Sequence, residues 1–112
     1  MQSASTKSRD WLLLASIVTL TIATGYIHYL VGGTLLLLNA AGYFALAAAV
    51  IGAVTLYRRA LPLVLITLAG YAGITIVAWA LMGPYFDLAY LAKAIEVVLI
   101  VSIGVELLRL RR

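Results

Sequence analysis

Four long apolar runs fill almost the whole of this 112-residue chain. Each is about as long as the roughly 20-residue helix that crosses a hydrocarbon core about 30 Å thick. The runs cover about residues 11–31, 34–57, 61–82 and 87–108, and the breaks between them are short. Short connections force consecutive helices to run antiparallel. The sequence therefore predicts an all-α, single-domain integral membrane protein, a four-helix bundle with antiparallel up-down topology.

The composition is typical of a chain whose solvent is lipid. Apolar residues make up 65% and charged residues 11%, and the mean hydropathy is +1.13. Soluble proteins are about 45–50% apolar and about 25% charged, and so small a soluble chain could not bury this much apolar surface. The chain has no cysteine, which excludes disulfides and thiolate metal sites from its own residues. We predict no metal site and expect the lipid bilayer to be the main partner.

The basic residues predict the orientation of the chain in the membrane. Of the eight Lys and Arg residues, all except Lys93 would lie on one side of the four spans: Lys7, Arg9, Arg58, Arg59, Arg109, Arg111 and Arg112. The positive-inside rule then places both termini in the cytoplasm of a multi-pass cell-membrane protein. Because the basic residues form no continuous face, we expect no nucleic-acid partner.

The polar residues 1–10 are expected to be frayed or interfacial, and the run after them to be an uncleaved helix. That run is longer than the 7–15 apolar residues of a signal peptide.

Small residues recur at helical spacing in the second and third runs. They are Ala41, Ala45, Ala49 and Ala53, then Ala69 and Gly73. Such stripes let helix backbones approach closely in lipid. The partner is another helix of this chain or another subunit, so we expect a homo-oligomer or a complex with other membrane subunits.

Two charges interrupt the fourth run. Lys93 and Glu96 are three residues apart and share a helix face. With a rise of 1.5 Å per residue, they would lie about 9 Å and about 13 Å below the outer boundary. Because an exposed charge costs about 2.5–3.5 kcal/mol in mid-membrane, both should face protein or trapped water. Glu106, near the cytoplasmic boundary, is expected to pair with Arg109 or Arg112.

Three polar residues on other helices would reach a similar depth. His28 would lie about 5 Å below the outer boundary and Asn39 about 7 Å, with Tyr43 one turn further in. Together with Lys93 and Glu96 they form a candidate polar cluster in the outer half of the bundle. Its role is either a buried network that fixes helix register or a site for a ligand, proton or quinone.

No catalytic motif is present, so we expect a non-enzymatic membrane subunit or interaction protein without a cofactor. One alternative is a small oligomeric transporter or channel that uses Glu96 and Lys93. Another is a quinone- or haem-binding subunit of a redox complex. Since His28 is the only histidine, a bis-histidine haem would need a second subunit.

Three segments carry a family resemblance: GYIHYLVGG, LLLLNAAGYFAL and YLAKAIEVVLI. With them the chain resembles uncharacterised small four-helix integral membrane proteins of archaea and bacteria, a resemblance that implies no activity. Its size and plan also look like those of the small multidrug resistance transporters. That family carries an essential glutamate in its first helix, whereas WLLLASIVTLTIATGYIHYL contains no acidic residue.

Overall fold

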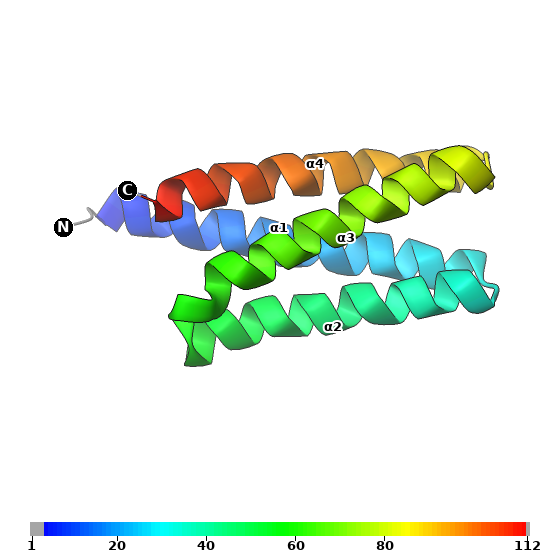
Figure 1. Ribbon diagram of the computed structural model, residues 1–112. Helices are drawn as coiled ribbons and strands as arrows, with labels where there is room; N and C mark the ends of the chain where they lie inside the picture. The colour runs from blue at the N-terminus through cyan, green and yellow to red at the C-terminus, as the bar shows by residue number, and fades with distance from the viewer. Residues whose placement is uncertain (1–3, 112) are drawn as a thin grey trace.

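The structure, a computed structural model, describes residues 4–111, with side chains described for residues 11–111. Four long helices account for most of this part (Figure 1): α1 (Ala4–Val31), α2 (Thr34–Leu56), α3 (Leu61–Met82) and α4 (Asp87–Leu110). A single 3-10 turn, η1 (Arg58–Ala60), joins α2 to α3. No strand occurs among residues 4–111. The predicted all-α fold with four helices is confirmed.

Consecutive helices run in opposite directions, so the connections and the termini gather at the two ends of the bundle (Figure 1). The two ends differ in their residues. One end holds both chain termini and the η1 turn with Arg58 and Arg59, and is called the basic end below. The other holds the connections 32–33 and 83–86 and is called the glycine end. The bundle is elongated, with principal extents of 47 × 22 × 18 Å.

Glycine makes the tight connections at the glycine end possible. Gly32 and Gly33 have φ values of 81° and 90°, and Gly83 has a φ of 75°. Side chains other than glycine are disfavoured in this region. At the basic end, Pro62 stands in the first turn of α3, where its missing N–H would have no partner within the helix.

Helix α1 begins at Ala4 rather than near residue 11, so the expectation of a frayed segment over residues 1–10 is wrong for residues 4–10. These residues include no glycine or proline, and several of them favour helices. The helix therefore continues beyond the apolar run. Met1–Ser3 lie outside the described residues, as do the side chains of Lys7, Arg9 and Arg112.

Each helix contacts two neighbours, in the cyclic order α1, α2, α3 and α4. In the described part of the chain, the diagonal pairs α1–α3 and α2–α4 make no close backbone contact. The centre between them is filled by apolar side chains from all four helices. Among those with no exposed surface are Ile17, Val50, Leu65, Leu68, Leu99 and Ile103.

The alanine stripe of α2 only partly faces the bundle. Ala53 is buried, whereas Ala41 and Ala45 are exposed. The buried face of α2 instead carries Ala40, Tyr43, Ala47, Val50 and Ala53. The buried face follows a spacing of three or four residues, whereas a strict four-residue stripe slowly rotates around a helix with 3.6 residues per turn. The exposed Ala41 and Ala45 thus lie on the outer surface of the bundle.

Most threonines of the helices bond back to their own backbone. Thr19, Thr21, Thr55, Thr67 and Thr75 each donate to the carbonyl four residues earlier, at 2.7–2.9 Å. Thr24 differs, since its buried Oγ1 has no hydrogen-bond partner among the described residues. Its backbone carbonyl, however, accepts a bond from His28.

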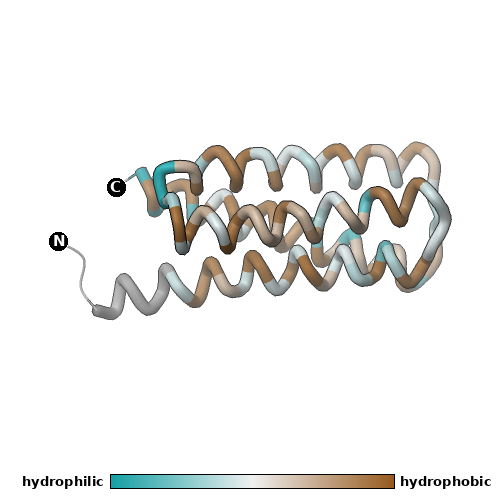
Figure 2. Tube along the Cα trace, turned by 90° about the horizontal axis from the view of Figure 1, so that it is seen from below, coloured by the Kyte–Doolittle hydropathy of each residue, from teal (hydrophilic) through white to brown (hydrophobic). Residues whose placement is uncertain are grey.

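The outer surface of the helices is apolar along most of its length. All four helices are long and apolar enough to cross a membrane, over Trp11–Val31, Thr34–Leu56, Arg58–Met82 and Asp87–Leu110. Figure 2 shows hydrophilic residues gathered at the basic end, with only scattered ones in the opposite half. Among residues 11–111, the exposed charged residues are Arg58, Arg59, Asp87 and Arg111, all in connections or at helix ends.

Candidate functional site

The five residues of the predicted polar cluster lie on three helices in the half of the bundle nearer the glycine end. His28 comes from α1, Asn39 and Tyr43 from α2, and Lys93 and Glu96 from α4. Tyr43 and Glu96 have no exposed surface, and His28 and Lys93 are only 4% and 9% exposed. Asn39 is half-buried. The structure arranges these residues in two groups, one around Tyr43 and Glu96 and one around Asn39, which meet where Tyr71 packs against Tyr43.

The first group is a contact across the centre of the bundle. Tyr43 Oη donates a hydrogen bond to Glu96 Oε2, joining α2 to α4. These two helices are diagonal and make no close backbone contact, so the long tyrosine side chain bridges the gap. A hydrogen bond to a buried carboxylate is stronger than one between neutral groups. The bond therefore fixes the position of α2 relative to α4.

Lys93 completes this group from the same helix as Glu96. Its Nζ lies 2.6 Å from Glu96 Oε1, and it also lies 5.9 Å from the centre of the Trp79 ring on α3. An ion pair at this depth lowers the cost of burying each charge, and the aromatic face stabilises the cation further. Tyr43 thus bonds one oxygen of Glu96, and the other is ion-paired with Lys93 but has no hydrogen-bond partner among the described residues. We name Tyr43, Glu96 and Lys93 the central triad.

His28 lies beside the central triad without hydrogen-bonding to it. Its ring centre is 5.5 Å from that of Tyr43, and Nδ1 lies 2.7 Å from the carbonyl oxygen of Thr24. A carbonyl oxygen only accepts, so Nδ1 carries the hydrogen. In the neutral ring, Nε2 is then an acceptor with a free lone pair.

Asn39 turns toward α3, not toward Lys93 and Glu96. Its Nδ2 lies 3.3 Å from Thr75 Oγ1, and its backbone carbonyl accepts a 2.8 Å hydrogen bond from Tyr71 Oη. Depth in the membrane was the sole reason to group Asn39 with the charged pair. Its hydrogen bonds instead hold α2 to α3, the second group of the cluster.

Three residues on α3 that were not predicted from the sequence complete the cluster. Tyr71, Thr75 and Trp79 are spaced by four residues and therefore share one face of the helix. The ring of Tyr71 packs edge-on against that of Tyr43, with 4.9 Å between the ring centres. Trp79 Nε1 donates a 2.5 Å hydrogen bond to the Pro84 carbonyl. Their four-residue spacing was a signal in the sequence that would have identified this polar and aromatic face.

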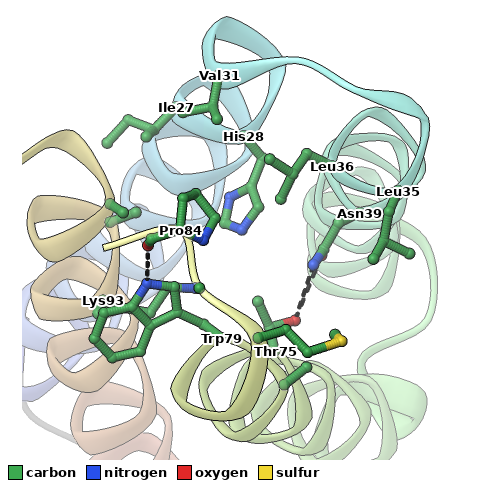
Figure 3. Close-up of a pocket in the computed structure, with 15 residues that line it drawn as sticks. Ile27, His28, Val31, Leu35, Leu36, Asn39, Thr75, Trp79, Pro84 and Lys93 are labelled. Atoms are coloured by element: carbon green, nitrogen blue, oxygen red, sulfur yellow. Dashed lines mark hydrogen bonds between the residues drawn. The ribbon is translucent and has the colours of Figure 1, made fainter. Parts of the chain in front are cut away.

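A pocket of about 70 Å³ opens beside the central triad at the glycine end (Figure 3). His28, Asn39, Thr75, Trp79 and Lys93 supply its polar wall, and Pro84 lies across it. The remaining lining is apolar: Ile27, Val31, Leu35, Leu36, Ala78, Met82, Gly83, Ala89 and Ala92. A water molecule needs about 10–15 Å³, whereas sites for drug-sized ligands are about 300–1,000 Å³. The pocket suits several waters or one small polar group, and is too small for a haem.

The pocket does not continue toward the basic end. Leu99 and Ile103 separate Glu96 from the second buried glutamate of α4, Glu106, and both belong to the closed apolar core. Glu106 Oε1 lies 3.6 Å from Arg109 Nε, one of the two predicted pairings. Arg112, the other predicted partner, lies outside the described residues. Glu106 has no exposed surface, so it is buried more deeply than a position near the boundary suggests.

The close approach of α2 and α3 at Gly42 provides a test of the second group. A methyl group at Gly42 would overlap the phenol of Tyr71, which would have to leave the Asn39 carbonyl. We expect Gly42→Ala to lower the free energy of unfolding by about 1–2 kcal/mol, measured by denaturant titration in detergent.

Gly52→Ala is the matched control on the same helix, because nothing lies within 4 Å of the added methyl group. It should be neutral or slightly stabilising, since alanine favours helices. Equal stabilities of the two variants would contradict the contact between Gly42 and Tyr71.

Comparisons with protein-family models, curated proteins and solved structures found no match for this chain. The candidate site is therefore defined by its geometry and chemistry. Among residues 4–111, no three metal-ligating His, Asp or Glu side chains come together.

Proposed function

We propose that the chain is a multi-pass protein of the cell membrane with its basic end in the cytoplasm. The observation that carries this proposal is the position of the charges. Between the helix ends, the described exposed surface is free of charged residues, and the charges of α4 are turned inward. Lipid penalises an exposed charge by several kcal/mol, whereas water does not. Arg58, Arg59 and Arg111 at one end favour cytoplasmic placement of that end.

Within the membrane, we propose a non-enzymatic role as a structural or interaction subunit. The central triad supports this role because Tyr43 hydrogen-bonds the Glu96 carboxylate and Lys93 is ion-paired with it. A carboxylate held in this way fixes helix positions. The closed apolar core between Glu96 and Glu106 also supports a protein that does not conduct.

The outer face of α3 supports contact with a further helix. A methyl group added at Gly70 or Gly73 would meet no neighbouring atom within 4 Å, so a second backbone has room to approach there. The exposed Ala41 and Ala45 on α2 offer similar room. The partner that we propose is a second copy of the chain or another membrane subunit.

Purification from mild detergent tests this role. We expect native mass spectrometry to give a homo-oligomer or a complex with other membrane chains. Gly73→Leu should reduce the associated fraction by about tenfold, since a bulky side chain keeps helices apart, whereas Leu63→Met, at an exposed position on the same helix, should not. A monomer at all protein concentrations would contradict the subunit role.

A further inference from the structure

The pocket at the glycine end has hydrogen-bonding groups that the protein itself leaves unused. His28 Nδ1 is occupied by the Thr24 carbonyl, and Nε2 has no hydrogen-bond partner among the described residues. Lys93 has three N–H donors, and its Nζ is ion-paired with Glu96 Oε1 at 2.6 Å. His28 is 4% exposed and the Lys93 side chain 11%, and both residues line the pocket (Figure 3). Buried polar groups without partners are costly, so this pocket favours an occupant that meets them.

The charges of the pocket indicate which occupant it favours. The charges of Lys93 and Glu96 cancel, and His28 in its neutral form adds no charge. The titratable groups around His28 are Tyr43 on α2, in contact with Tyr71 of α3, and Lys93 and Glu96 on α4. A group that enters should therefore bring no net charge, one donor for Nε2 and one acceptor for the ammonium. A protonated carboxyl group has this combination on one carbon atom.

We propose that the pocket binds the carboxyl group of an aliphatic acid, between His28 Nε2 and Lys93 Nζ. The acid enters with its proton, which either remains on oxygen or moves to Nε2. In both cases no charge is added to the pocket. The apolar part of the acid would lie against Ile27, Leu36 and Met82, which line the same pocket. This binding site goes beyond the proposed subunit role and is tested separately from it.

The only histidine of the chain provides a direct probe. With ¹⁵N-histidine label in nanodisc-embedded protein, Nε2 should give the signal of an unprotonated ring nitrogen without acid. Butyrate at about pH 6 should shift that signal toward a protonated or hydrogen-bonded nitrogen. Affinity, expressed per total butyrate, should fall about tenfold for each pH unit above about pH 7, because one proton enters with each acid.

Two further ligands test which chemical group the pocket binds and whether the ligand comes from water or from the bilayer. The methyl ester of butyric acid keeps the carbonyl acceptor for Lys93 but has no donor for Nε2, and is expected to bind at least about tenfold more weakly, because Nε2 would remain without a partner. A long-chain acid added to the nanodisc lipid tests whether the ligand comes from the bilayer. If both acids shift the signal, the acid that binds more tightly identifies the favoured source, which is the aqueous phase for butyrate and the bilayer for the long-chain acid.

Variants separate binding from folding. The double variant K93M/E96Q removes both charges together and keeps an acceptor for Tyr43. It should remain folded but bind butyrate at least about tenfold more weakly. Tyr29→Phe, an exposed neighbour of His28 outside the pocket, should bind as the wild type does. The proposal is overturned if neither acid shifts the Nε2 signal, if the methyl ester binds equally well, or if the double variant retains full affinity.

Discussion

Replacing Lys93 alone by methionine should lower the free energy of unfolding by about 3–5 kcal/mol, because the Glu96 carboxylate would remain buried without its cation. Glu96 has no exposed surface, and Lys93 Nζ is 2.6 Å from it. Tyr43 alone would then stabilise the negative charge. Denaturant titration of the purified protein, followed by helical circular dichroism, measures this loss.

The double variant K93M/E96Q is the informative partner of this experiment. It removes both charges together, and Gln at position 96 can still accept the hydrogen bond from Tyr43. We expect it to recover most of the lost stability, since a buried ion pair is often close to neutral relative to uncharged side chains of similar size. A single variant as stable as the wild type, or a double variant no better than the single, would show that the pair does not hold the helices.

A charge placed on the outer face of α4 should be almost as damaging. Val98 lies near the middle of the helix and is 53% exposed. In lipid, Val98→Arg should cost about 2.5–3.5 kcal/mol in the insertion of this helix. On a water-exposed helix face, the same change would stay within about 0.5 kcal/mol. The inserted fraction of α4, measured with a glycosylation reporter in microsomes, distinguishes these two outcomes.

Tyr57→Arg is the control for this effect. Tyr57 is similarly exposed but lies beside Arg58 at the basic end, where arginine is already accepted. Its insertion should match that of the wild type. If Val98→Arg inserts equally well, the outer face of α4 does not face lipid.

Much of the fold could be predicted because helix length and apolarity directly determine a membrane span. The breaks at Gly32, Gly33 and Gly83 mark real helix ends, since the backbone there adopts conformations that favour glycine. The start of α1 could not be predicted in this way, because the apolar run begins at Trp11 whereas the helix already begins at Ala4. A hydropathy pattern does not reveal a helical segment that consists of polar residues.

The candidate site could be predicted less completely. The pairing of Lys93 with Glu96 follows from their spacing on one helix. The bond from Tyr43 to Glu96 depends on how diagonal helices rotate, and no local pattern encodes that rotation. Depth placed Asn39 near Lys93, but only the packing of α3 shows that Thr75 and Tyr71 are its partners.

Labelling of single cysteines in intact cells tests the membrane topology most directly, because the chain has no cysteine of its own. A membrane-impermeant maleimide should react with Thr34→Cys and Asp87→Cys at the glycine end, which would face outward. Arg59→Cys and Arg111→Cys at the basic end should react only after the cells are opened. Labelling of the basic end in intact cells, or of all four positions alike, would contradict a four-span protein with cytoplasmic termini.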